Sequence, residues 1–181
     1  MIETAIITTE RLILRLPTPA DRAALHAMWA DPRVMADLSH VKDAAASDAT
    51  IAKHDGYRHE GLGFWIVECK ADRVVAGFCG LKRGGENTPI EGELEIGWSL
   101  AVPYWGRGYA FEASVAGIAW GWANRPEHRI VAITAARNLK SQGLMERLGM
   151  SRLADGDFEH PNFAPGDPLR PTVTYAIARP V

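Results

Sequence analysis

Hydrophobic and polar positions alternate near the start of the chain, where leucines occupy every second position from 12 to 16. A period of two is typical of a half-buried strand. The next residues, Thr18, Pro19 and Asp21, are of the types favoured at a helix start. Apolar residues then recur at i, i+3 and i+4, which predicts a helix that ends before Asp31-Pro32.

A second, weaker helix is expected to open at Ser47 or Asp48, after a connection over residues 33–46. Beyond Gly63 the chain becomes aromatic and β-branched, a composition typical of strands. Two such runs, residues 64–69 and 74–81, are separated by a short polar turn. They predict a β-hairpin.

The second half of the chain reads as alternating strands and helices. We expect a polar loop at 84–92, a strand at 93–102, a long helix ending near Asn124, a buried strand at 130–135, a helix at 138–148 with Gly149 just past its end, and two last strands at 151–158 and 173–178. Gly117 and Gly121 would let the long helix lie close to a sheet. Together these elements predict one mixed-sheet α/β domain over residues 1–181.

Composition places the chain among ordinary globular domains. It has 181 residues, 47% of them hydrophobic, and 20 basic against 22 acidic side chains, which gives a net charge of −2. A net charge this close to zero gives no electrostatic indication of binding to nucleic acid or to an anionic membrane. Cys69 and Cys79 suggest neither a disulfide framework nor a zinc site, so we expect a cytoplasmic protein. The six histidines show no metal-ligand spacing, and no metal site is predicted.

The most informative segment runs from Val102 to Ala110, between a predicted strand and the long helix. Gly106 and Gly108 allow a tight turn, and the first N–H groups of a helix have no partner within it, so the segment suits a phosphate group. Arg107 adds a positive charge. A dinucleotide fingerprint is excluded because Phe111 stands at its third glycine position, and no P-loop is present. A plain strand-to-helix turn remains the alternative.

Four segments in register resemble the GCN5-related N-acetyltransferases (GNAT), and most closely their RimJ/RimL-type branch. The loop Tyr104–Ala110, followed by Glu112-Ala113, resembles the acetyl-CoA loop of this family. The other three segments are Thr9-Glu10-Arg11-Leu12 with Arg15, Glu95-Ile96-Gly97-Trp98, and Asn138-Leu139-Lys140-Ser141 followed by Leu148-Gly149-Met150. The resemblance spans Thr9 to Tyr175.

The resemblance implies a mostly antiparallel sheet that splays at the cofactor site and is flanked by helices. It also implies acetyl-CoA as cofactor, with pantetheine amides paired to the main chain of Leu100, Ala101 and Val102. Its pyrophosphate would rest on main-chain N–H groups of the loop, contributed by Trp105, Gly106, Arg107, Gly108, Tyr109 and Ala110. A primary amine would approach from the other side and attack the thioester directly. A homodimer is the default expectation for this branch.

Two residues depart from the family pattern. Trp105 stands where the family usually has a polar side chain, which shifts phosphate binding toward the main chain and Arg107. Met145 stands where many members have a tyrosine that protonates the departing thiolate, and methionine has no proton to donate. Ser141 is the nearest replacement.

Amide formation from an amine and a thioester requires a proton acceptor for the amine and stabilisation of the leaving sulfur. Glu95 is the first candidate for the base, ahead of Glu93 on the same face of its strand. A solvated carboxylate or a partner of an arginine is the alternative for Glu95. Asn138 is expected to cap a helix and to contact pantetheine. Ser141 is expected to hydrogen-bond the coenzyme sulfur.

The leading hypothesis is an acetyl-CoA-dependent N-acetyltransferase that works through a ternary complex, with no acetyl-cysteine intermediate. A non-catalytic acyl-CoA-binding module and an unrelated phosphate-binding α/β protein are the alternatives. The acceptor stays open among protein N-termini, polyamines, amino acids and aminoglycosides. Residues 33–46 and 159–170 are expected to shape its pocket, with Trp29 and Trp98 as candidate walls.

Overall fold

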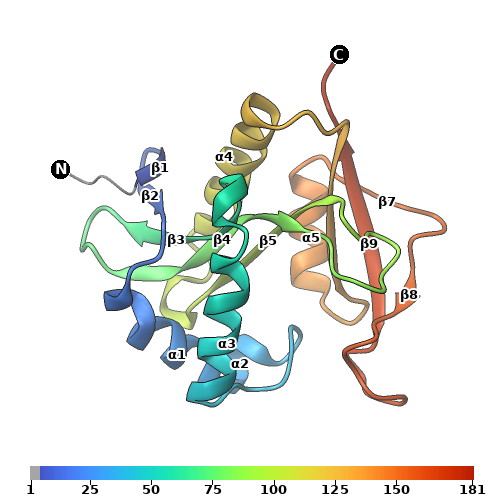
Figure 1. Ribbon diagram of the computed structural model, residues 1–181, viewed down its shortest axis with the longest axis horizontal. Coiled ribbons are helices and arrows are strands. Elements are labelled where there is room, and N and C mark those ends of the chain that lie inside the picture. The colour runs from blue at the N-terminus through green and yellow to red at the C-terminus, as the bar shows by residue number, and fades with distance from the viewer. Residues whose placement is uncertain (1–4) are drawn as a thin grey trace.

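The computed structural model describes residues 5–181, and a single mixed sheet runs through this part of the chain (Figure 1). The strand order is β1-β2-β3-β4-β5-β6-β9-β7, with β8 paired to β9. The strands are β1 (Ala5–Thr8), β2 (Leu12–Arg15), β3 (Gly63–Cys69), β4 (Val75–Arg83), β5 (Leu94–Leu100), β6 (Arg129–Ala135), β7 (Ser151–Arg152), β8 (Phe158–Glu159) and β9 (Pro171–Ala178). Every neighbouring pair is antiparallel except β5 and β6.

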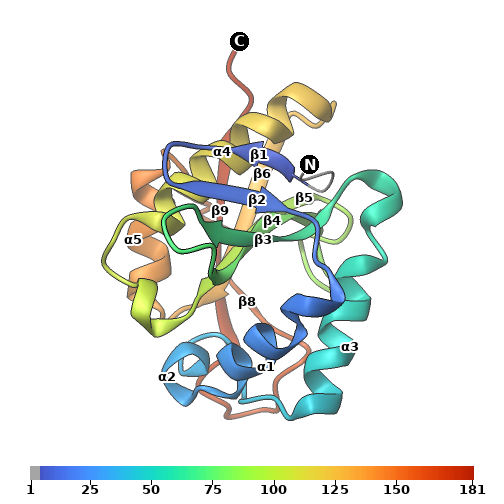
Figure 2. The same cartoon turned by 90° about the vertical axis from the view of Figure 1, so that its left-hand side faces the viewer.

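Helices cover both faces of this sheet. They are α1 (Arg22–Ala30), α2 (Pro32–Met35), α3 (Ala44–Asp55), α4 (Tyr109–Asn124) and α5 (Leu139–Arg147), with short 3-10 turns η1 (Pro19–Asp21), η2 (Arg58–Glu60) and η3 (Val102–Tyr104). Figure 2 shows α1, α2 and α3 on one side of the sheet and α4 on the other. Among the described residues, no helix is both long enough and apolar enough to cross a bilayer.

Two apolar clusters hold the layers together. The larger one lies between the sheet and helices α4 and α5, and Trp65, Ile96 and Ile130 are among its members. Gly121 brings α4 close to the sheet, because a Cβ there would lie 3.0 Å from side-chain atoms of both Ile130 and Leu81. The smaller cluster joins α1 and α2 to the opposite face of β3 and β4. The mixed sheet flanked by helices is therefore as predicted.

Three local predictions are wrong. The structure places the start of the second helix at Ala44, because the Asp43 carboxylate accepts a hydrogen bond of 2.8 Å from the Ala46 N–H and caps it. Within the predicted connection 33–46, the structure adds α2, which Asp31 caps. The strand expected at 151–158 is two short strands, β7 and β8, which pair with different parts of β9.

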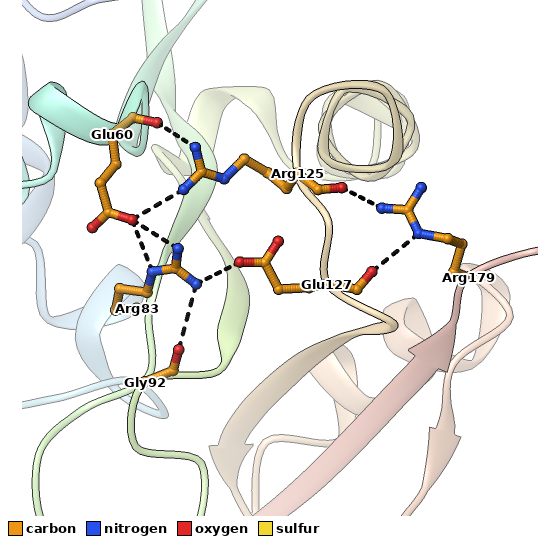
Figure 3. Close-up of polar contacts among 6 residues, drawn as sticks. All are labelled: Glu60, Arg83, Gly92, Arg125, Glu127 and Arg179. Atoms are coloured by element: carbon orange, nitrogen blue, oxygen red, sulfur yellow. Dashed lines mark hydrogen bonds and ion pairs between the residues drawn. The ribbon is translucent and has the colours of Figure 1, made fainter.

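An ion-pair network joins the segments at one end of the sheet (Figure 3). Arg83, at the end of β4, bridges two carboxylates at 2.7 Å each, and the pKa of Glu60 lies below its ordinary value chiefly because Arg83 donates to it. Arginines after α4 and β9 extend the network through main-chain carbonyls. Its members are Glu60, Arg83, Gly92, Arg125, Glu127 and Arg179.

Candidate active site

The parallel strands β5 and β6 pair at one position, Glu95 opposite Val131, and then separate. Along β5, the main-chain N–H and C=O groups of successive residues point alternately toward β4 and toward β6. The Ala101 N–H points toward β4, because it donates to the Ala76 carbonyl at 2.8 Å. The alternate residues Trp98 and Leu100 therefore direct their main-chain groups toward β6, where no partner strand remains. This opening is the splay that the resemblance implied.

A cavity of about 260 Å³ lies at the opening. It is lined by Glu95 from β5 and by Ser141 and Met145 from α5, so the structure brings the two predicted catalytic residues to one place. The opposite wall comes from α1, α2, α3 and the strands β3 and β4. This wall includes Trp29, Met35, Thr50, Phe64 and Phe78, and the cavity is also lined by Lys42, which precedes α3, and by Trp98 and Ser99 of β5.

Glu95 is buried, with 5% of its surface exposed. Its Oε2 is ion-paired with the Nζ of Lys82, the residue directly opposite on β4. Within the described residues, its Oε1 accepts no hydrogen bond and is available to a ligand. The sequence suggested a solvated carboxylate or an arginine partner, and the observed partner is a lysine instead. Cross-strand register could have revealed this pair, had β4 been predicted to reach residue 82 and to pair with β5.

Glu93, the second candidate base, lies elsewhere. Its carboxylate pairs with the Arg129 guanidinium at 2.6 Å, near the edge where β6 begins, and it does not line the cavity. The structure thus separates two carboxylates that the alternating pattern placed on one face.

Asn138 caps α5, as predicted, through its side-chain oxygen, which accepts from the Ser141 N–H at 3.1 Å. Its amide nitrogen lies within hydrogen-bond distance of the Thr134 hydroxyl (2.9 Å), the Ser141 hydroxyl (3.1 Å) and the Asp37 carbonyl (3.3 Å). Because Ser141 Oγ accepts from Asn138, the hydroxyl proton of Ser141 remains available to a ligand in the cavity. Thr134, which positions this amide, carries no signal in the sequence pattern.

Main-chain N–H groups of residues 106–111 form no hydrogen bond within the described part of the chain. We call these six groups the anion seat. Gly106 and Gly108 have φ values of 72° and 78°, a region that favours glycine, and Gly108 is the N-cap of α4. A Cβ at Gly106 would meet no atom within 4 Å. The seat therefore combines unpartnered donors with the positive end of a helix dipole.

The turn between β1 and β2 forms hydrogen bonds with the segment that carries the anion seat. The Glu112 carboxylate accepts hydrogen bonds from the Thr9 hydroxyl at 2.6 Å and from the Arg11 side chain at 2.6 Å. Arg11 also donates to the Arg107 carbonyl at 2.9 Å and lies over the Tyr109 ring. Burial opposes charge on Glu112, but these donors outweigh it and hold its pKa below the ordinary value. The motif that begins at Thr9 and the loop motif that resembles the acetyl-CoA loop are therefore in direct contact.

The segment between β5 and the seat has its carbonyls occupied. The Ala101 carbonyl accepts from the Tyr104 N–H and the Val102 carbonyl from the Trp105 N–H. The Leu100 carbonyl accepts from the Trp105 indole at 2.7 Å. The Nζ of Lys140 on α5 also lies 4.9 Å from the centroid of the Trp105 ring. This contact connects the segment after β5 with the helix that follows β6. Sequence reasoning noted the missing polar side chain at Trp105 but not this bond.

The two loops expected to shape an acceptor pocket contact each other. The His40 Nε2 lies 2.8 Å from an Asp167 carboxylate oxygen, and its ring packs edge-on against Phe163. Together with the end of β6 they line a second cavity of about 290 Å³. Leu38, Ser39, Ile133 and Thr134 line both cavities, so the second extends from the first.

A sequence model described as an acetyltransferase (GNAT) domain matches residues 11–151. The chain belongs to the GNAT acetyltransferase family. It is 30% identical over 147 residues to the uncharacterized N-acetyltransferase YnaD of Bacillus subtilis, covering 81% of this chain and 82% of that protein.

Solved structures of this GNAT family have the same fold. An acetyltransferase from Bacillus anthracis superposes with a TM-score of 0.75 at 28% identity, over 96% of this chain and 98% of that one. RimL, a ribosomal L7/L12 alpha-N-protein acetyltransferase in complex with coenzyme A, reaches 0.75 at 16% identity, over 96% and 97%. The predicted fold and acetyltransferase activity are thereby confirmed. The roles of individual site residues stay predictions.

Proposed function

We propose that this GNAT protein transfers the acetyl group of acetyl-CoA to a primary amine by direct attack in a ternary complex. One observation carries the proposal: the cavity at the β5–β6 opening holds Glu95 and Ser141, and the chain that leaves the end of β5 leads to the unpartnered donors of the anion seat. A phosphate site and an acid–base pair at the two ends of one opening suit a long, phosphate-bearing thioester.

In this proposal the coenzyme pyrophosphate binds the anion seat, with Arg107 adding charge. The pantetheine arm then lies along β5, where Trp98 and Leu100 present main-chain groups that β6 leaves unpaired. An extended arm pairs with such a strand edge in the way that a peptide adds to a sheet. The Leu100 carbonyl already accepts from Trp105, so its N–H and the groups of Trp98 are the available partners.

Glu95 is proposed as the base. An alkyl ammonium must lose a proton before its nitrogen attacks the thioester carbon. Glu95 Oε1 accepts that proton, directly or through a water molecule, while Lys82 holds Oε2. The new C–N bond then forms as the C–S bond breaks, and the second proton that the nitrogen loses neutralises the coenzyme thiolate.

Ser141 is proposed to stabilise the departing sulfur. Its hydroxyl oxygen accepts from Asn138, which leaves its proton available for a hydrogen bond into the cavity. A hydrogen bond to the thiolate performs part of the task that Met145, buried in the same cavity, cannot perform.

The cysteines support direct transfer over an acetyl-cysteine intermediate. Neither Cys69 nor Cys79 lines the cavity, and both are buried. Burial raises the pKa of the Cys79 thiol to about 12, which leaves almost no nucleophilic thiolate near neutrality. Two unpaired buried thiols also fit our expectation of a reducing compartment such as the cytoplasm.

The test is release of coenzyme A from acetyl-CoA in the presence of a panel of amines, with mass spectrometry of the products. The panel contains amino acids, their amides, polyamines, aminoglycosides and short peptides. The proposal expects an N-acetylated product from at least one member. Tight coenzyme binding without turnover across the whole panel would instead favour a non-catalytic acyl-CoA-binding module.

A further inference from the structure

One wall of the acceptor side of the cavity is aromatic. The rings of Phe64 and Phe78 stack at 4.0 Å between centroids, and Trp29 tilts against Phe78 at 5.9 Å. Gly97 on β5 makes room for Phe64, because a Cβ there would lie 3.2 Å from the ring. This wall offers an acceptor an apolar surface rather than hydrogen-bond partners.

Lys42 lines the same cavity, and among the described residues no carboxylate lies within ion-pair distance of its ammonium group. The lining includes one carboxylate within the described chain, that of Glu95, and Lys82 pairs with its Oε2. Lys42 is half-buried beside a mostly apolar cavity, so an anion bound at its ammonium group would gain a charge-assisted hydrogen bond that no side chain of residues 5–181 provides there.

Three lysines lie near this wall. The pKa of His54, which stacks on Phe64, falls to about 3, first because of burial and then because of Lys82, Lys53 and Lys42. Burial and the nearby Lys53 lower the pKa of Lys42. The nearby acids are used elsewhere: Asp43 caps α3, Asp37 pairs with Arg137, and Asp167 pairs with His40.

We infer that the acceptor is a small amino carboxylate: a primary amine that also carries a carboxylate, bound by Lys42, on an apolar or aromatic body that packs against Trp29, Phe64 and Phe78. This inference rests on the proposed function and names its substrate class. A polyamine or aminoglycoside would add positive charge to a positive wall. The same potential favours the neutral form of the substrate amine, which is the nucleophile.

The experiment compares kcat/KM for phenylalanine, leucine and methionine with kcat/KM for their amides, in the wild type, Lys42→Met and Lys53→Met. The two members of each pair have the same side chain and an amine at the same position. The amine of the amide is less basic, so a larger fraction of it is neutral near pH 7, and without recognition of the carboxylate the amide would be the better acceptor. The wild type is expected to prefer at least one free amino acid by about tenfold, the scale of one charge-assisted hydrogen bond.

Lys42→Met is expected to remove that preference by lowering kcat/KM for the amino acid about tenfold, with the amide changed less than about twofold. Lys53→Met, an exposed charge removed from the same region, should leave most of the preference. The inference is overturned if amides or spermidine are preferred, or if the preference survives in Lys42→Met. In those cases the protein still acetylates an amine, so the proposed function holds and only the inferred substrate class is wrong.

If no amine is acetylated, the proposed function fails. The inference about the carboxylate is then tested separately, by measuring how tightly the cavity binds ligands with and without a carboxylate. Trp29 and Trp98 line the cavity, so their fluorescence reports on ligands. With coenzyme A present, N-acetylphenylalanine should bind the wild type more tightly than its amide and lose that advantage in Lys42→Met. Equal binding of acid and amide overturns the inference.

Discussion

The indole Nε1 of Trp105 donates a hydrogen bond of 2.7 Å to the main-chain carbonyl of Leu100. This bond ties the loop that begins the anion seat to the end of β5, across the turn η3. Trp105 therefore orders this loop from within.

Trp105→Phe keeps a ring and removes this hydrogen bond. We expect the dissociation constant for coenzyme A to rise about 2- to 10-fold, the range of one net hydrogen bond. Titration calorimetry measures it. Trp122→Phe is the matched control, because the Trp122 indole nitrogen makes no hydrogen bond within residues 5–181. Equal affinity in both variants would mean that the bond does not order the seat.

Gly108→Val should block coenzyme binding, because a β-branched side chain is strained at φ 78° and occupies space beside the seat. Gly166→Val is a control with the same kind of backbone strain, at φ 86°, in the acceptor-side loop. It should bind coenzyme A like the wild type. Unchanged affinity in Gly108→Val would contradict the location of the seat.

Glu95→Gln should lower kcat by about 100-fold or more, the scale of general-base catalysis, and leave coenzyme affinity nearly unchanged. Glu93→Gln, which removes a carboxylate paired with Arg129 outside the cavity, should keep wild-type turnover. Thermal melting of both variants checks that loss of the Lys82 partner has not unfolded the protein. Wild-type turnover in Glu95→Gln would remove it as the base.

Ser141→Ala removes the hydroxyl but keeps the N–H that Asn138 caps. We expect kcat to fall about 10- to 100-fold, with coenzyme affinity and melting temperature close to wild type. Steady-state kinetics under saturating coenzyme report this. A drop in coenzyme affinity with unchanged kcat would assign Ser141 to binding instead.

Asp21 makes a buried bidentate pair with Arg15, at 2.7 and 2.8 Å, and also accepts from Thr18. Burial is the largest effect and opposes its charge, but these donors outweigh it, so its pKa lies below the ordinary 3.8. The pair's contribution to stability is therefore full above the unfolded-state pKa. It is lost as pH falls through the lower folded-state value.

Asp21→Asn should lower the free energy of unfolding by about 3 kcal/mol near pH 7, since it leaves Arg15 without one of its carboxylates. The difference from wild type should shrink as pH falls below about 3.8. Urea unfolding at a series of pH values measures both. A difference that stays constant down to pH 2 would show that charge on Asp21 does not carry the effect.

Local patterns predicted most of the architecture, because hydrophobic periodicity and caps act over a few residues. The β3–β4 hairpin and the end of α4 at Asn124 lie where the sequence placed them. One failure involves tertiary pairing: β7 and β8 exist as separate strands because each pairs with a different part of β9. The other two, the start of α3 and the short helix α2, lie at aspartate caps that the sequence pattern did not single out.

The candidate site was predictable where a motif carried it and not where distant segments meet. The turn at Gly106 and Gly108 is visible in the sequence, because few other residues adopt positive φ. The Lys82–Glu95 pair depends on strand register, and Lys42 reaches the cavity from a connection without any recognisable pattern. Such contacts are set by the packing of the whole chain.

The most direct test of the account is a crystal structure with coenzyme A bound. The account predicts the pyrophosphate against the N–H groups of residues 106–111, the pantetheine arm between β5 and β6, and the sulfur within hydrogen-bond distance of Ser141 Oγ. A coenzyme whose phosphates lie away from this loop, or whose sulfur ends outside the cavity that holds Glu95 and Ser141, would contradict it.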